Sequence, residues 1–169
     1  MRVRGALTAC MLALACAGMG AAQSAAGSHT MLHHRAPEFA RTGLDGKRVD
    51  LNAYRGKVVL LDFWATWCAP CQLEMPHFAA WQAQYAAQGL QVIGISMDDD
   101  AAAARAVVTK LRLNYPVAMG DAKLGERYGG VLGLPLTFLI DRHGVVRAEF
   151  QGEAKLNAIE TEMKALLYP

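Results

Sequence analysis

The chain has no strong excess of charge of either sign. Its 17 lysines and arginines oppose 15 aspartates and glutamates over 169 residues, which gives a formal net charge of +2. Without residues 1–22, whose only charges are Arg2 and Arg4, the two totals become equal at 15. A nucleic-acid or polyanion partner would call for a basic excess, so the composition gives no support for one.

The sequence also lacks a hydrophobic run long enough for a comfortable membrane span. Its most apolar N-terminal stretch, residues 6–17, is short and alanine-rich, follows Arg2 and Arg4, and leads into small residues that end at Ala22. These features are typical of a secretory signal peptide, so we expect cleavage after Ala22. An uncleaved membrane anchor and lipidation at Cys16 are the alternatives. Each of the three places the remaining chain in the periplasm or another compartment outside the cytoplasm.

Cysteine is scarce, with four residues in the whole chain. Cleavage would remove Cys10 and Cys16 and leave only Cys68 and Cys71, which are separated by two residues. Structural disulfides of exported proteins normally join distant segments, and so short a loop restrains the unfolded chain little. We therefore interpret the pair as a redox-active disulfide. A metal site would need further ligands, and the nearest candidate, His77, faces elsewhere, so no metal is expected.

The cysteine pair lies where an expected strand meets an expected helix. Residues 58–64 are an apolar run typical of a buried strand, and residues 69–88 have a helical pattern that ends at Gly89. The unpaired backbone N–H groups and the dipole of a helix N-terminus favour a thiolate. Cys68 should therefore be exposed and nucleophilic, and Cys71 more buried. Pro70 suits the first helical turn because it has no N–H to leave unpaired.

The remaining pattern alternates strands with helices, which predicts an α/β sheet covered on both faces. A flexible leader (23–35) should precede one domain (36–169). The expected elements are a hairpin over 39–51, strands at 90–97 and 115–119, helical segments at 101–111 and 124–128, a second hairpin over 136–150 and a final helix at 153–167. The Asp98-Asp99-Asp100 run is interpreted as the solvated start of the helix that follows it.

Four motifs at matching spacing resemble the TlpA/ResA group of exported thiol–disulfide oxidoreductases, which have a thioredoxin-like fold. The motifs are APEF (36–39), GKVVL (56–60), FWATWCAPC (63–71) and GLPLTFLID (133–141). The resemblance covers roughly residues 36–168. It implies a central mixed sheet flanked by helices, an N-terminal hairpin, and a helix-and-strand insertion at about 98–119 before the cis-proline loop.

The resemblance also assigns roles to single residues. It implies a cis bond before Pro135 that faces the disulfide and leaves the backbone of Leu134 open to a bound polypeptide. Leu136 departs from the threonine or serine usual after this proline, which affects partner contact rather than the fold. Trp67 and Pro70 should also contribute to the partner surface. Phe78, Trp81 and Tyr85 fit helical spacing and are expected in the core, as is Trp64.

Two acids are candidates for proton handling. Asp62 lies inside the apolar run 59–64, where burial would raise its pKa, and it matches a buried aspartate of thioredoxin. We expect it to act as the general base for Cys71. No lysine occupies residues 92–95, where thioredoxin keeps a charged partner for this aspartate. Glu74 either tunes the pKa of the thiols or stabilises the helix.

The function implied by the resemblance is that of a protein-disulfide reductase of the cytochrome c maturation type. Its partners would be disulfide-bearing envelope proteins such as apocytochrome c, with a membrane thiol reductant as electron donor. No cofactor is needed because the cysteines carry the electrons. The alternatives are a dithiol oxidase or isomerase and a copper-delivery protein. Strong oxidases usually carry a histidine where this chain has Ala69-Pro70, and copper delivery would need a longer cysteine spacing and His143. A peroxidase is disfavoured because Ala65 stands where those enzymes carry threonine.

Overall fold

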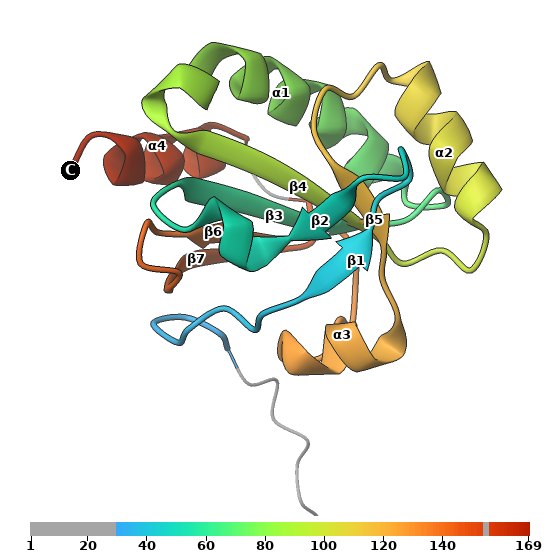
Figure 1. The fold of residues 1–169 in the computed structure, drawn as a ribbon, viewed down its shortest axis with the longest axis horizontal. Coiled ribbons are helices and arrows are strands. Elements are labelled where there is room, and N and C mark those ends of the chain that lie inside the picture. The colour runs from blue at the N-terminus through green and yellow to red at the C-terminus, as the bar shows by residue number, and fades with distance from the viewer. Residues whose placement is uncertain (1–29, 154–155) are drawn as a thin grey trace, which may run out of the picture.

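The computed structural model describes residues 30–153 and 156–169. Its centre is a mixed sheet of five strands in the order β5-β4-β3-β6-β7 (Figure 1). The strands are β3 (Val58–Trp64), β4 (Leu90–Ser96), β5 (Val117–Met119), β6 (Leu136–Ile140) and β7 (Val146–Gln151). β3 lies parallel to β4 and antiparallel to β6. Every residue of β3, β4 and β6 is buried, as expected for apolar strands covered on both faces.

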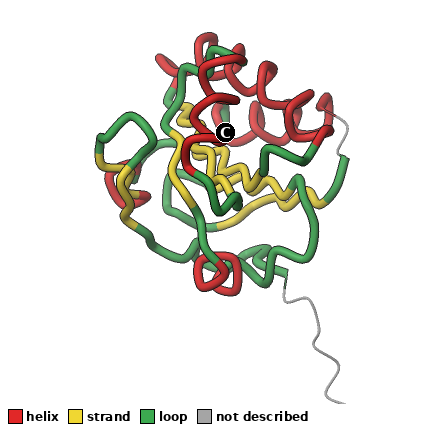
Figure 2. The backbone as a smooth tube through the Cα atoms, turned by 90° about the vertical axis from the view of Figure 1, so that its right-hand side faces the viewer, coloured by secondary structure: helices red, strands yellow, loops and turns green. Residues whose placement is uncertain are grey.

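Helices and a hairpin cover the two faces of this sheet, as the sequence predicted (Figures 1 and 2). One core cluster joins the sheet to α1 (Ala69–Tyr85), α2 (Ala101–Lys110) and α4 (Leu156–Leu167). The other lies beneath the hairpin of β1 (Ala40–Thr42) and β2 (Arg48–Asp50), the 3₁₀ helix η1 (Leu51–Tyr54) and α3 (Ala122–Arg127). The two core clusters shield both faces of the sheet from water. The ends of its strands are the places left for a functional site.

The end of β3 leads directly into α1, which is the arrangement expected around the cysteines. Cys68 is the N-cap residue of α1, Pro70 lies in its first turn, and Pro76 lies inside it. A short 3₁₀ helix, η2 (Ala86–Gln88), continues α1, and Gly89 ends it in the left-handed conformation with φ 99°. The expected core residues Trp64, Phe78, Trp81 and Tyr85 are all buried.

Several element boundaries differ from the prediction by a few residues, among them the start of α3, which is Ala122 rather than residue 124. β5 begins at Val117 rather than at residue 115. Pro116 has no N–H to donate to the sheet, although its carbonyl accepts a hydrogen bond from the Gly94 N–H at 3.0 Å. Tyr115 therefore precedes the strand, with its side chain buried. Glu153 lies before α4, which begins at Leu156, and residues 154–155 lie outside the described chain.

The described chain is ordered six residues earlier than the expected domain start at Ala36. Residues 30–35 lie along β7, the edge strand of the sheet. The His33 N–H donates to the Val146 carbonyl at 2.8 Å, and the Val146 N–H donates to the His34 carbonyl at 2.9 Å. An edge strand has free backbone groups, so such pairing needs no side-chain pattern, and none is visible in the sequence. The expected signal peptide and the first part of the leader lie outside the described residues.

Candidate active site

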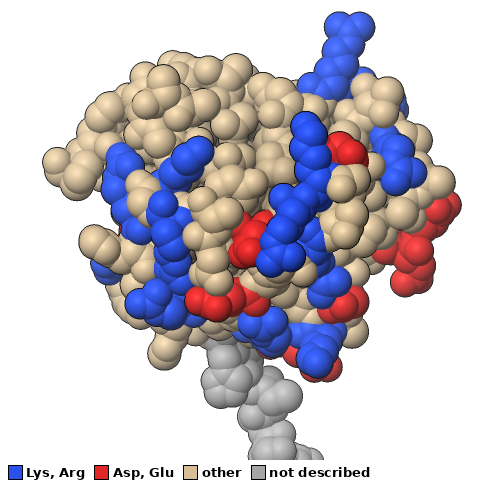
Figure 3. All heavy atoms as spheres, viewed as in Figure 1, with Lys and Arg blue, Asp and Glu red and all other residues tan. Residues whose placement is uncertain are grey.

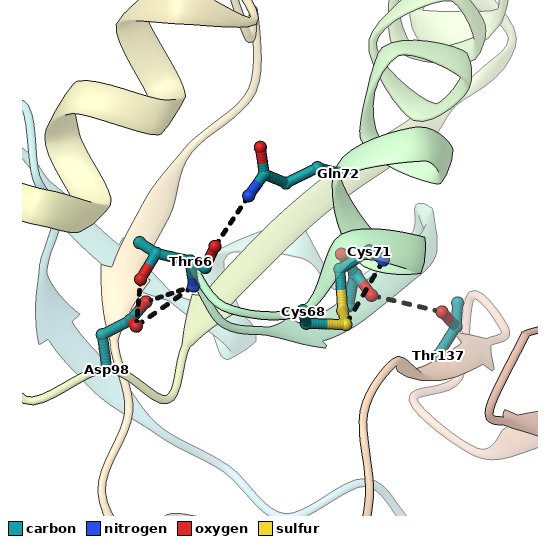
Figure 4. Close-up of a disulfide and its surroundings, with 7 residues drawn as sticks. Thr66, Cys68, Cys71, Gln72, Asp98 and Thr137 are labelled. Atoms are coloured by element: carbon teal, nitrogen blue, oxygen red, sulfur yellow. Dashed lines mark hydrogen bonds between the residues drawn. A yellow bond between two sulfur atoms is a disulfide. The ribbon is translucent and has the colours of Figure 1, made fainter.

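The two cysteines are joined in a disulfide at the start of α1 (Figure 4). The S–S distance is 2.01 Å. The backbone N–H of Cys71 donates to Cys68 Sγ at 3.3 Å, so this sulfur takes the place of an N-cap oxygen. In the reduced protein the same N–H would point at the Cys68 thiolate and stabilise it. The sequence-predicted pair is therefore placed where thiol chemistry is favoured.

The expected difference in exposure between the two cysteines is absent from the disulfide state. Cys68 is 4% exposed and Cys71 is 1% exposed, so the prediction that Cys68 is exposed was wrong for this state. Both cysteines belong to the core cluster of α1, and Leu134 packs against that cluster. In contrast, Trp67 is 73% exposed and Leu73 is 71% exposed. A partner approaching the disulfide would therefore meet apolar side chains before it meets sulfur.

Asp98 holds the loop before α1, which contains Thr66 and Cys68, in place through hydrogen bonds (Figure 4). Its carboxylate accepts hydrogen bonds from the Thr66 N–H at 2.9 Å, from Thr66 Oγ1 at 2.7 Å and from Ser96 Oγ at 2.8 Å. On the other side, Gln72 Nε2 of α1 donates to the Thr66 carbonyl at 2.7 Å. The loop is thus fixed to the end of β4 and to the helix that it precedes.

This position corrects the interpretation of the aspartate run as a solvated helix start. Asp100 does cap α2, because its side chain accepts from the Ala102 N–H at 2.8 Å. Asp98 instead belongs to the site. One signal was available in the sequence: Asp98 follows β4 as Thr66 follows β3, and adjacent parallel strands end at the same edge of the sheet.

We expect Asp98→Ala to destabilise the protein, because it leaves the Thr66 N–H and two hydroxyl groups without their charged acceptor. The free energy of unfolding should fall by roughly 2 kcal/mol. Asp99→Ala is the matched control, since Asp99 is an exposed acid next in the chain. Urea unfolding of both variants measures the difference. Equal stability of the two would show that the Asp98 contacts contribute nothing.

Two acidic side chains are buried between α1 and the sheet. Asp62, 1% exposed, lies in the middle of β3, with Gly94 and Thr137 opposite it on the neighbouring strands. Burial raises the pKa of Asp62 to about 8, and the negative charge of Glu74 adds to the effect. The hydroxyl of Thr137 donates to Asp62 Oδ1 at 3.3 Å and partly offsets this rise in pKa. The expected burial and raised pKa of Asp62 are therefore both present.

The placement of Glu74 argues against the helix-stabilising role, whereas its effect on the pKa of the thiols stays a prediction. Its side chain is buried, and it lies on α1 three residues after Cys71. It is the sixth residue of α1, beyond the first turn in which an interaction with the helix dipole is strongest. Its charge acts on Asp62 instead. The two acids are therefore coupled on the helix-facing side of the sheet, where the charge of Glu74 raises the pKa of Asp62.

The predicted cis bond is present between Leu134 and Pro135. Pro135 is buried, and Leu134 is partly buried and packs against both core clusters. Leu136, which replaces the usual hydroxyl residue, is the first residue of β6, lies opposite Phe63 and is buried in the core. Its departure from the family pattern therefore changes core packing rather than the surface that a partner would touch.

The structure separates His143 from the cysteines. β6 runs from Leu136, opposite Phe63, to Ile140, opposite Val59, so the turn that follows it lies at the other end of the sheet. His143 lies in that turn. Within residues 30–153 and 156–169, no group of three or more histidine, cysteine, aspartate or glutamate residues could hold a metal ion. A copper site built from His143 and the cysteines would therefore require a different fold.

Comparison with known proteins supplies the family. The AhpC/TSA family model matches residues 32–149. ResA, a thiol–disulfide oxidoreductase of Bacillus thuringiensis subsp. konkukian, is 36% identical over 131 residues, which cover 78% of this chain and 76% of that protein. The chain belongs to the ResA thiol–disulfide oxidoreductases, within the AhpC/TSA family.

Solved structures agree with this membership. A provisionally named thiol:disulfide interchange protein DsbE from Chlorobium tepidum superposes with a TM-score of 0.74 at 36% identity, over 79% of this chain and 95% of that one. A secreted thiol–disulfide isomerase from Corynebacterium glutamicum superposes with a TM-score of 0.72 at 26% identity, over 79% of this chain and 86% of that one. This ResA-family protein therefore has a thioredoxin-like fold and is a redox enzyme that acts through thiol–disulfide exchange.

Proposed function

We propose that this enzyme works as a disulfide reductase on proteins of the cell envelope, of the kind needed for cytochrome c maturation. The observation that carries the proposal is the buried Asp62, whose pKa of about 8 lets it take up or release a proton near neutral pH. It lies on the same helix-facing side of the sheet as Cys71. A base in this position can activate the second thiol, Cys71, for its attack on the mixed disulfide.

The reaction proceeds in two exchanges. The Cys68 thiolate attacks one sulfur of the partner disulfide, so a mixed disulfide forms and the other partner sulfur leaves as a thiolate. Asp62 then takes the proton of the Cys71 thiol, and the Cys71 sulfur attacks Cys68 Sγ. The bond between Cys68 and the partner breaks, and the partner leaves as a thiolate. Two electrons have passed to the partner, and the enzyme holds the Cys68–Cys71 disulfide seen here. A membrane thiol reductant would regenerate the dithiol.

The surface next to the disulfide fits an unfolded polypeptide rather than a charged ligand. Trp67 and Leu73 are exposed there, and the only Lys, Arg, Asp or Glu within α1 is the buried Glu74. In Figure 3 the surface over the later turns of α1, at the upper left and away from the disulfide, is also free of charged side chains. Leu134 and Pro135 would offer backbone for pairing, with Pro70 at the helix start. An apocytochrome segment with its C-x-x-C-H motif is a partner of this kind.

The location outside the cytoplasm rests on the N-terminal sequence. Residues 1–22 have the features of a signal peptide or anchor, and the remaining chain keeps a single cysteine pair. Within the described residues, none of the helices has the length and apolar character needed to span a membrane.

The test is the reduction of an oxidised peptide that carries a C-x-x-C-H motif. The reduced enzyme should open this disulfide and itself become oxidised. Trp67→Ala should slow the reaction about tenfold, through loss of an aromatic contact at the partner surface, while its reaction with a small dithiol stays unchanged. Tyr168→Ala, which removes an exposed aromatic side chain at the end of α4, is the matched control. Net transfer of electrons from the peptide dithiol to the enzyme disulfide would overturn the assigned direction.

A further inference from the structure

Trp67 is held on the outside of the molecule although its neighbours in the chain are shielded from solvent. Its side chain is 73% exposed, whereas the other two tryptophans, Trp64 and Trp81, are buried. Ala65 and Cys68, on either side of it in the loop, are buried as well. An indole ring gains free energy when it folds back onto apolar neighbours and leaves water. The exposed position of Trp67 therefore calls for a restraint on the loop.

The restraint comes from the end of β4. The Met97 N–H donates to the Trp64 carbonyl at 2.8 Å, so the parallel pairing of β3 and β4 continues one step past both strands. This step brings Asp98 beside Thr66, and its carboxylate accepts from the Thr66 N–H at 2.9 Å and from Thr66 Oγ1 at 2.7 Å. Two donors of one residue on one carboxylate fix the orientation of the residue that precedes Trp67.

The carboxylate of Asp98 is itself fixed to the core of the sheet. Ser96 Oγ donates to Asp98 Oδ2 at 2.8 Å, and the Asp98 N–H donates to Ser96 Oγ at 3.3 Å. Ser96 is the last residue of β4 and is fully buried. Hydrogen bonds to an ionised acceptor are stronger than those between neutral groups. Asp98 therefore joins the loop to a rigid strand through strong contacts.

The helix side of the loop is fixed too. Gln72 Nε2 donates to the Thr66 carbonyl at 2.7 Å, and the Gln72 N–H donates to the Cys68 carbonyl at 3.3 Å. Figure 4 shows Asp98 and Gln72 on opposite sides of Thr66. Both neighbours of Trp67 in the chain are thus held before any partner arrives. An anchor that is ordered in advance loses less conformational freedom on binding, which increases affinity.

We propose that Asp98 is a positioning residue for partner recognition. Through Thr66 it keeps Trp67 projecting beside the disulfide, where the indole meets the polypeptide that exchanges disulfides with Cys68. The inference rests on the proposed partner surface, in which Trp67 contacts the partner, and not on the direction of electron flow. The hydrogen bonds of Asp98 go to Thr66 and Ser96, so it acts through the loop rather than on sulfur. Asp98 thereby favours polypeptides over small disulfides.

The experiment compares two substrates of the reduced full chain. One is the oxidised peptide with the C-x-x-C-H motif, and the other is hydroxyethyl disulfide, which offers no polypeptide to Trp67. The readout is the ratio of the two second-order rate constants. Asp98→Ala should lower this ratio roughly fivefold, through lost ordering of one anchor side chain. A loss of stability alone would slow both reactions alike and leave the ratio unchanged.

Two further variants separate position from charge. Asp98→Asn removes the charge but keeps an oxygen acceptor for Thr66 and places an amide donor toward Ser96, so it should restore most of the ratio. Asp99→Ala is the matched control, because Asp99 is an exposed acid next in the chain, and its ratio should equal that of the wild type. A ratio for Asp98→Asn as low as that for Asp98→Ala would mean that charge, and not position, is responsible, and would overturn the inference.

A double-mutant cycle tests whether Asp98 acts through Trp67. In the Trp67→Ala background, Asp98→Ala should lower the ratio no further, because the side chain that it positions is gone. An equal loss in both backgrounds would overturn the inference. If Trp67→Ala lowers the ratio and Asp98→Ala does not, the inference is wrong and the partner surface stands. If Trp67→Ala itself leaves the ratio unchanged, the partner surface is wrong and the inference falls with it.

Should Asp98→Ala fail to fold, NMR relaxation of the wild-type protein without a partner gives a separate readout. The backbone N–H groups of Thr66 and Trp67 should have order parameters of about 0.85, as in rigid secondary structure. Values below about 0.6 would show a flexible loop and would overturn the inference.

Discussion

Cys68→Ser should abolish turnover, whereas Cys71→Ser should stop the reaction halfway and accumulate a mixed disulfide on Cys68. The Cys68 sulfur sits at the N-cap of α1 and receives the Cys71 N–H, which favours its thiolate as the attacking group. Cys71 acts only afterwards, as the group that releases the partner. Both variants should lose roughly a thousandfold or more in turnover. Mass spectrometry of the enzyme after reaction with a disulfide peptide detects the adduct.

The critical result is that a mixed disulfide accumulates in the Cys71→Ser variant and not in the Cys68→Ser variant. Cys10→Ser is the matched control, because Cys10 lies in the segment that we expect to be removed, and it should react as the wild type does. A stable adduct on Cys71 in the Cys68→Ser protein, together with none on Cys68 in Cys71→Ser, would reverse the assigned roles.

Asp62→Asn should make the protein more stable, and more so as the pH rises. The pKa of Asp62 is about 8 in the folded protein, against an ordinary value of 3.8 for an aspartate in the unfolded chain. Below about pH 4 the carboxyl is protonated in both states, so no stability is lost. Between about pH 4 and 8 the unfolded chain releases this proton while the folded protein retains it, and stability falls. Above pH 8 the loss is complete, with an upper limit on the order of 5 kcal/mol.

Urea unfolding at pH 4 and pH 8.5 measures this effect. The asparagine variant should gain stability over the wild type at pH 8.5 and little at pH 4, and Asp99→Asn should show no such dependence. A stability difference that is the same at both pH values would mean that Asp62 titrates normally. The same variant should slow the attack of Cys71 at neutral pH. Single-turnover rates that equal those of the wild type from pH 6 to 9 would rule out the base role.

The amino-acid sequence was sufficient to predict the fold and the reactive cysteine pair, and the reasons are physical. The apolar runs of β3 and β4 and the pattern of α1 specify buried strands beside a helix, and Gly89 marks the end of the helical region. An acid in the middle of a buried strand must itself be buried, which made Asp62 recognisable. These features depend on local sequence alone.

The features that sequence analysis missed depend on contacts between distant segments. Three consecutive aspartates look alike in a sequence, and only the common edge of β3 and β4 singles out Asp98 as the partner of Thr66. The pairing of residues 30–35 with β7 uses backbone groups and leaves no pattern. The burial of Cys68 in the disulfide state comes from packing in the core cluster of α1.

The most direct test of the central claim is the reduction potential of the Cys68–Cys71 pair, measured by equilibration with a dithiol redox buffer. The account of a reductase supplied by a membrane thiol donor predicts a value of about −250 mV or lower, near the thioredoxin end of the range. A value near about −120 mV, in the range of a strong envelope oxidant, would contradict it and would make the protein a donor of disulfides.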